Sequence, residues 1–267
     1  MTKLGPMIKF FRKIRQSLVT ENKVSKYLLY AIGEIVLVVI GILIALQINN
    51  ANEARKSRKQ EVHYLKNLKT DLQLNIAELD QYITTRNGRI ESAKKVLEHF
   101  EGKPLTDLND FAFNTTNIYI WQKFTQHDNT FQELVNSGNL ALISNDSIKN
   151  GLLNLESLYQ KLKNEEAHFR YDAEVLLYEP SYGVLDLNPI VKNFTYQVTG
   201  GQAGQNVELP RANYEAMLKD IKQKNGFVMA VYEFSVMNAQ FNEMKAVCAS
   251  IIALIDKELK NEKEQRL

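Results

Sequence analysis

An uninterrupted run of apolar residues near the start of the chain dominates its hydrophobic pattern. In GEIVLVVIGILIALQINN, residues 33–50, Glu34 is the only charged side chain. A helix from Tyr27 to Ile48 would extend roughly 33 Å, which is close to the hydrocarbon thickness of a bilayer. Its aliphatic residues outweigh the cost of about 3 kcal/mol that one carboxylate adds to insertion. We therefore predict a transmembrane helix over residues 27–49, in preference to a buried core helix or a cleaved signal peptide.

Residues 1–26, ahead of this helix, form a basic segment that we expect on the cytoplasmic side of an inner membrane. Lysine and arginine are slightly more abundant here than in the flank after the helix, which favours a cytoplasmic N-terminus and a periplasmic C-terminal domain. Apolar residues recur at helical spacing opposite Lys9, Arg12, Lys13 and Arg15. This pattern predicts a short amphipathic helix on the anionic membrane surface, and the alternative is a basic flank without a helix of its own.

One face of the predicted transmembrane helix combines a carboxylate with small residues. Its members follow one another at spacings of three or four: Glu34, Leu37, Gly41, Ala45 and Ile48. Small residues allow two helices to approach closely, and a carboxylate in lipid is either protonated or paired. We predict a helix–helix contact through this face, with a second copy of the chain or with another inner-membrane protein. The alternative is a neutral Glu34 that is bonded within its own helix.

Residues 50–267 are expected to form a periplasmic helical-bundle domain, because helical spacing of apolar residues continues through most of them. The first apolar stripe covers residues 65–100. Gly102 is expected to stop this helix, and a bend is expected at residues 87–88. The strongest stripe keeps an unbroken three-four spacing: Phe227, Ala230, Phe234, Met237, Phe241, Met244, Cys248, Ile251 and Ile255. The predicted fold class is all-α, with an N-terminal transmembrane helix followed by an elongated antiparallel helical bundle with two irregular loops.

The first irregular segment, residues 105–144, is mixed in character and rich in aromatic side chains. Within it, TFQELVNSG at residues 130–138 predicts a short helix closed by Gly138. Ser144 is the expected N-cap of the next long helix, which should reach Pro180.

The second irregular segment, residues 180–210, contains three prolines and the glycine-rich stretch TGGQAGQ. We predict no helix here, and only a weak strand-like alternation through Phe194, Tyr196 and Val198. Irregular segments of this length are often functional or mobile.

Composition excludes some classes of function without identifying one. The chain has 33 lysines and arginines against 31 aspartates and glutamates, a balance that does not support binding to nucleic acid. Its single cysteine, Cys248, excludes an internal disulfide and a cysteine-based metal cluster, and its position on the apolar stripe predicts a packing role.

Candidate chemistry is sparse. The four histidines occur in no metal-ligand motif, His127-Asp128 is interpreted as surface polarity, and Glu165-Glu166 is interpreted as part of a solvated helix face. Asp146-Ser147-Ile148 fits a pattern for bacterial O-glycosylation at Ser147, although a helix start explains the same residues. We expect no catalytic residue, no cofactor and no metal site, and therefore no enzyme.

Two stretches of the sequence carry a resemblance. They are MIKFFRKIRQ…YAIGEIVLVVIGILIALQINN and TFQELVNSGNLALI, the second followed by a helix with Leu158-Tyr159. Both resemble an uncharacterised family of single-pass inner-membrane proteins of Bacteroidota. The resemblance implies an inner-membrane protein with a helical domain facing the envelope, and it supplies no reaction.

Two functions agree with this pattern. The first is a non-enzymatic, membrane-anchored helical envelope protein that oligomerises or holds a partner as a scaffold or accessory subunit. The alternative is a sensor-like periplasmic bundle that binds a small ligand and signals through a separate partner. The alternative requires a pocket between helices, and a fully packed core would count against it.

Overall fold

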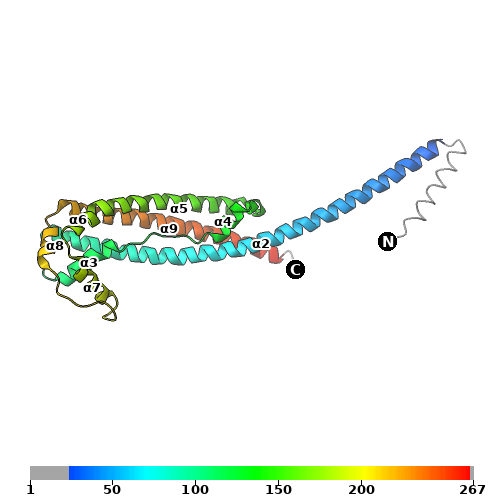
Figure 1. Ribbon diagram of the computed structural model, residues 1–267. Coiled ribbons are helices and arrows are strands. Elements are labelled where there is room, and N and C mark those ends of the chain that lie inside the picture. The colour runs from blue at the N-terminus through cyan, green and yellow to red at the C-terminus, as the bar shows by residue number, and fades with distance from the viewer. Residues whose placement is uncertain (1–23, 265–267) are drawn as a thin grey trace. The chain divides into compact units, whose positions relative to one another are not determined.

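The computed structural model describes residues 24–264, which form helices and loops without a strand in that range (Figure 1). The prediction of an all-α chain is therefore confirmed. Two compact units are present, residues 1–60 and residues 61–267. The basic residues assigned to membrane-surface binding, Lys9, Arg12, Lys13 and Arg15, lie outside the described residues.

The described part of the first unit belongs to helix α2, which begins at Val24 and ends at Phe100. Within residues 24–264, this is the one helix that is long and apolar enough to cross a membrane. Its aliphatic side chains are exposed throughout the apolar run, with Leu37 at 72% and Ile48 at 63%. Exposure of so many consecutive aliphatic side chains would be unfavourable in water and is typical of helices that face lipid.

The second unit contains the rest of α2 and seven further α-helices. These are α3 (Leu108–Tyr119), α4 (Asn129–Asn136), α5 (Asp146–Ala173), α6 (Glu179–Tyr182), α7 (Leu187–Val198), α8 (Arg211–Met217) and α9 (Ile221–Glu264). A short 3-10 helix, Asn139–Leu142, precedes α5, and a π-helical segment, Glu174–Tyr178, joins α5 to α6.

Three long helices, α2, α5 and α9, lie side by side in this unit (Figure 1). Helix α9 runs antiparallel to α2, because Lys69 pairs with Asp256 at 2.5 Å whereas Asn87, further along α2, accepts a hydrogen bond from Asn238. Helices α2 and α5 run in the same direction. The chain reverses between them because residues 120–128 return along α2. There the Asn75 side chain donates a hydrogen bond to the His127 carbonyl and accepts one from the His127 N–H.

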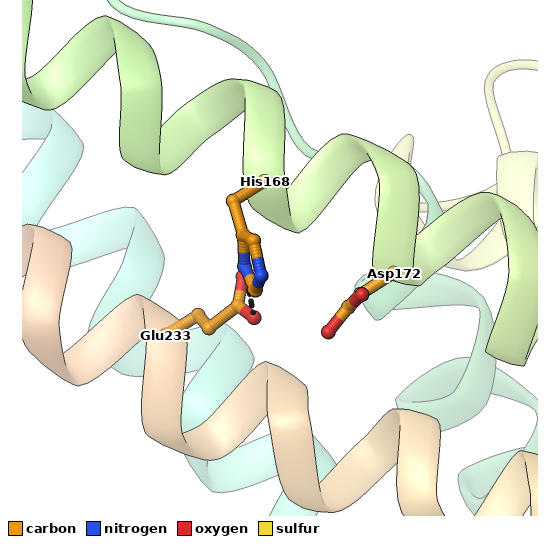
Figure 2. Close-up of side chains that lie close together, drawn as sticks. All are labelled: His168, Asp172 and Glu233. Carbon is orange, nitrogen blue, oxygen red and sulfur yellow. Dashed lines mark hydrogen bonds and ion pairs between the residues drawn. The ribbon is translucent and has the colours of Figure 1, made fainter.

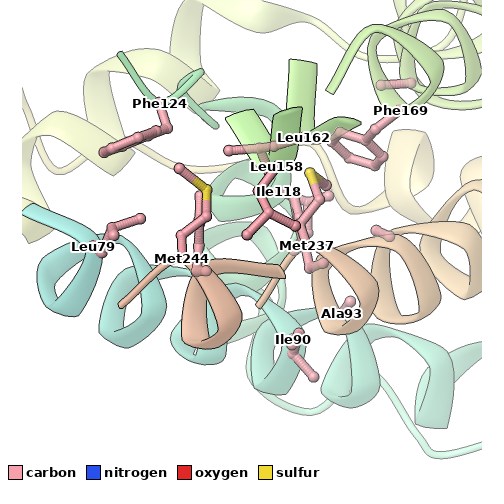
Figure 3. Close-up of a cluster of buried hydrophobic side chains, with 14 of the residues drawn as sticks. Leu79, Ile90, Ala93, Ile118, Phe124, Leu158, Leu162, Phe169, Met237 and Met244 are labelled. Atoms are coloured by element: carbon pink, nitrogen blue, oxygen red, sulfur yellow. The ribbon is translucent and has the colours of Figure 1, made fainter. Parts of the chain in front are cut away.

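The predicted apolar stripe of α9 forms the centre of the core. Every one of its members, from Phe227 to Ile255, is buried. They pack against α2, α3 and α5 around the cluster drawn in Figure 3, which includes Leu79, Ile118 and Leu162. The three-four spacing therefore predicted the packed face of α9 correctly, because a helix with that spacing presents one continuous apolar side.

The main error of the sequence analysis concerns residues 180–210, where α6, α7 and the start of α8 are helical instead of strand-like. The prolines taken as helix breakers lie at helix starts, where proline has no hydrogen bond to lose. Pro180 is in the first turn of α6, Pro189 in the first turn of α7, and Pro210 is the N-cap of α8. The glycines after α7 carry the turn, and Gly201 has a φ of 85°.

Smaller differences occur at helix boundaries. Helix α3 was not predicted. The N-cap of α5 is Asn145 and not Ser144, since the Asn145 side chain accepts hydrogen bonds from the first turn. The short helix closed by Gly138, at φ 72°, is confirmed.

Candidate functional site

The two irregular segments meet at the end of the second unit that holds α3, α6, α7 and α8, and there they line a cavity of about 320 Å³ (Figure 1). Its walls come from α3, the end of α5, the segment from α6 to α7, and α8. The lining residues are Thr115, Thr116, Tyr119, Ile120, Arg170, Tyr178, Ser181, Tyr182, Leu185, Leu187, Ile190, Val191 and Tyr214. A volume of this size is at the lower end of the range for small-molecule sites.

A connected set of hydroxyl groups forms the polar part of the floor. The Tyr119 hydroxyl lies 2.6 Å from Ser181 Oγ, and Ser181 in turn donates to Gln223 Oε1 at 3.2 Å. The Tyr178 hydroxyl donates to the Tyr119 carbonyl at 3.0 Å and accepts from Trp121 Nε1 at 3.1 Å. Because these bonds join α3 to α6 and to the π-helical segment, they hold the cavity walls at fixed positions.

Tyr214 is the one tyrosine in this floor that lacks a partner for its hydroxyl. The residue is fully buried, and its oxygen makes no hydrogen bond within the described chain. Burial raises the pKa of Tyr214, so the hydroxyl remains a neutral donor at physiological pH. A buried polar group without a partner costs about 1–3 kcal/mol.

Apolar side chains form an exposed rim around this buried floor. Val191 of α7 is 57% exposed and Tyr182 of α6 is 63% exposed, and Ile120 and Leu187 are exposed as well. The rim therefore offers apolar surface at the mouth, where an entering molecule would first make contact.

Arg170 supplies the one positive charge among the lining residues. Its guanidinium lies 5.3 Å from the ring centre of Tyr178 and forms an ion pair with Glu174 at 3.1 Å. No carboxylate lines the cavity, so the local charge favours a neutral or anionic ligand over a cation.

The π-helical segment explains how Tyr178 reaches the cavity. One additional residue per turn between Glu174 and Tyr178 rotates the following side chains relative to an α-helix, and such segments often occur at functional sites. The same segment packs closely on α9, where a Cβ atom added to Gly226 would lie 2.5 Å from Leu177 Cδ2. Gly226 is therefore needed for α9 to approach the segment that positions Tyr178.

A second group of chemically active side chains lies between α5 and α9. His168, Asp172 and Glu233 each offer a ligand atom within 4.8 Å of the others (Figure 2). This group was not predicted, because no metal-ligand motif connects its members along the chain and Glu233 comes from a different helix. The available signal was the four-residue spacing of His168 and Asp172, which places both on one face of a helix.

The structure corrects the interpretation of Glu166 as part of a solvated face. Glu166 is fully buried and accepts a hydrogen bond from Arg86 at 2.9 Å, and Arg86 is fully buried too. Burial lowers the pKa of Arg86 to about 10 while Glu166 opposes that change, so the guanidinium is charged at neutral pH.

The remaining candidates lie apart from the cavity. His127 Nε2 lies 3.2 Å from Glu78 Oε2, and His127 lines a cavity of about 20 Å³ that is large enough for roughly one water molecule. Cys248 is buried in the core, as predicted. Ser147 is exposed in the first turn of α5, where its backbone N–H donates to Asn145.

In the first unit, the predicted contact face is accessible. Glu34 is half-buried, and Leu37, Gly41, Ala45 and Ile48 are exposed. A Cβ atom added to Gly41 would meet nothing within 4 Å, so this face leaves room for another helix.

Comparison with known proteins gives a family without an assigned activity. No curated protein matches the chain, and no solved structure matches it. Residues 34–179 match a family described as "Family of unknown function (DUF6090)", and this region runs from the apolar helix to the start of α6. Because the match covers more than half of the chain, the protein belongs to the family of unknown function DUF6090.

Proposed function

We propose that this chain is a membrane-anchored sensor-like domain that binds a small molecule in the cavity between α3, α6, α7 and α8. The observation that carries this proposal is a cavity of about 320 Å³ that has an exposed apolar rim and walls held by hydrogen bonds between Tyr119, Tyr178 and Ser181. The role is binding without catalysis, and a separate partner protein would pass on the signal.

The lining defines the chemistry of the proposed ligand. Aromatic and aliphatic side chains make up most of the walls, so the ligand carries an apolar or aromatic body. Thr116 and Tyr182 offer hydroxyl groups among the lining residues, and Arg170 offers a positive charge there. Together they favour a small aromatic or aliphatic molecule with a carbonyl or carboxylate group.

The proposed location follows from the apolar helix. An N-terminal anchor in the inner membrane of a Bacteroidota cell, a cytoplasmic basic segment at residues 1–26 and a periplasmic domain from residue 50 agree with the positive-inside rule. The basic residues Lys9, Arg12, Lys13 and Arg15 would add attraction to anionic lipid headgroups.

A scaffold role is the second candidate, and the accessible face of the apolar helix supports it. Leu37, Gly41, Ala45 and Ile48 are exposed beside the half-buried Glu34, in a pattern that suits a helix–helix contact. This contact, with a second copy or with another inner-membrane protein, is compatible with ligand binding and would supply the partner that a sensor needs.

The test is to purify the full-length chain from its native membranes in nanodiscs and to identify bound small molecules by native mass spectrometry. The wild type is expected to retain a molecule of the stated class. Thr116→Trp places a large ring on a lining residue and should abolish retention, whereas Leu153→Trp, at an exposed position of α5 outside the lining, should leave retention unchanged. Equal retention by all three proteins, or by none, would overturn the proposal.

A further inference from the structure

The group formed by His168, Asp172 and Glu233 lies on facing sides of two helices that pack along most of their length (Figure 2). His168 and Asp172 are one helical turn apart on α5, and Glu233 is on α9. Figure 2 shows the imidazole directed at the Glu233 carboxylate, with the Asp172 carboxylate beside them. His168 Nδ1 lies 3.0 Å from Glu233 Oε1.

The charge balance of this group is incomplete. The Glu233 side chain is 4% exposed, and its second oxygen, Oε2, is buried without a hydrogen-bond partner in the described chain. Within residues 24–264, no lysine or arginine is ion-paired with either carboxylate. A positive charge between two neighbouring carboxylates of which one is buried would stabilise them, and it could be a proton on His168, a proton on a carboxylate or a metal ion.

The geometry points to a metal ion: we propose that His168, Asp172 and Glu233 bind a divalent first-row transition-metal ion such as Zn²⁺. One imidazole nitrogen and two carboxylate oxygens form a ligand set that such ions accept in proteins. Bonds of about 2.1 Å place neighbouring ligand atoms roughly 3.0–3.4 Å apart. The nitrogen–oxygen distance of 3.0 Å already meets this requirement, and the three ligand atoms all lie within 4.8 Å of one another, so small side-chain movements would close the site around an ion.

The proposed site is open to solvent and has room for a further ligand. The His168 side chain is 61% exposed, so an ion reaches the site from solvent without unfolding the bundle. Three protein ligands leave at least one coordination position for water or for a partner's side chain. A bound ion would join α5 to α9 just before the π-helical segment that begins at Glu174, and it would therefore stabilise the arrangement of these two helices.

The experiment measures binding of Zn²⁺ to the metal-free full-length chain in nanodiscs, by competition with a chromophoric chelator. We expect one Zn²⁺ per chain, displacement by excess chelator, and a higher unfolding temperature with Zn²⁺ than without it. His168→Gln and Glu233→Gln should each weaken Zn²⁺ binding by at least about tenfold. His63→Gln, at an exposed histidine of α2, is the matched control and should bind Zn²⁺ as the wild type does.

Substitution with Co²⁺ gives a readout that does not depend on stability. Co²⁺ bound by one imidazole and two carboxylates should produce visible absorption bands that are lost in His168→Gln and kept in His63→Gln. Absence of saturable Zn²⁺ binding to the wild type would overturn the proposal and leave a shared proton as the balancing cation. Equal binding by the wild type and His168→Gln would also overturn it, since the ion would then be held elsewhere.

Discussion

The buried ion pair between Arg86 and Glu166 allows a quantitative test of how the bundle is held together. Arg86 Nη2 lies 2.9 Å from Glu166 Oε1, and neither side chain is exposed to solvent. The guanidinium carbon is 4.4 Å from the ring centre of Phe241 on α9, so the pair connects all three long helices. For two charges about 4 Å apart, an effective dielectric constant of roughly 20 gives an attraction of about 4 kcal/mol.

Replacing either Arg86 or Glu166 alone should lower the free energy of unfolding more than replacing both. Arg86→Met leaves Glu166 with the Phe124 N–H at 2.8 Å and with Lys163 at 3.3 Å, and we expect a loss of about 3 kcal/mol. Glu166→Met leaves the Arg86 charge without a counter-ion, while Nε and Nη1 already lack partners, and we expect a loss of about 5 kcal/mol. The double variant mainly orphans the Phe124 N–H, which costs about 1–3 kcal/mol.

The assay is urea unfolding of the full-length chain in nanodiscs, followed by fluorescence of Trp121. This residue is the only tryptophan of the chain, and it packs on Phe169 with ring centres 4.9 Å apart. We expect a coupling free energy between the two sites of at least about 3 kcal/mol, with unchanged denaturant dependence. Glu91→Gln, which removes an exposed ion pair with Lys94, is the control and should cost less than about 1 kcal/mol. Losses that add to within about 0.5 kcal/mol would refute the reasoning.

Three further predictions concern other parts of the chain. Gly226→Ala should destabilise the bundle by about 1–3 kcal/mol because the new methyl group meets Leu177. Gly88→Ala has open space around it and should stabilise α2 by up to about 1 kcal/mol. Urea unfolding of both variants measures the two changes in stability. Burial raises the pKa of Cys248 to about 12, so a thiol reagent at pH 8 should label it only after denaturation, and rapid labelling of the folded chain would contradict its position in the core. Glu34→Leu should reduce the mass of the assembly measured by light scattering in mild detergent, and an unchanged mass with unchanged co-purifying proteins would count against a contact through that face.

The sequence predicted those parts of the fold in which one physical signal dominates. The nine apolar positions from Phe227 to Ile255 defined the buried face of α9 without tertiary information, because helical spacing alone places them on one side. The apolar run around Glu34 likewise predicted a helix with the length and composition of a membrane span.

The cavity was not predictable, because it depends on contacts between segments that lie far apart in the sequence. Tyr119 on α3 and Ser181 on α6 are brought together only in the folded chain, and α7 was missed because its proline, Pro189, lies in the first helical turn. Glu166 presents the same difficulty, since only the position of Arg86 on another helix reveals that the charge is compensated inside the core.

The most direct test of the account is an experimental density map of the full-length chain purified from its native membranes. We expect discrete non-protein density in the cavity between Tyr119, Ile190 and Tyr214, with a polar atom of the bound molecule near Arg170 or a lining hydroxyl. A cavity that is filled by the protein's own side chains, or that contains only ordered water, would contradict the proposal that this domain binds a small molecule.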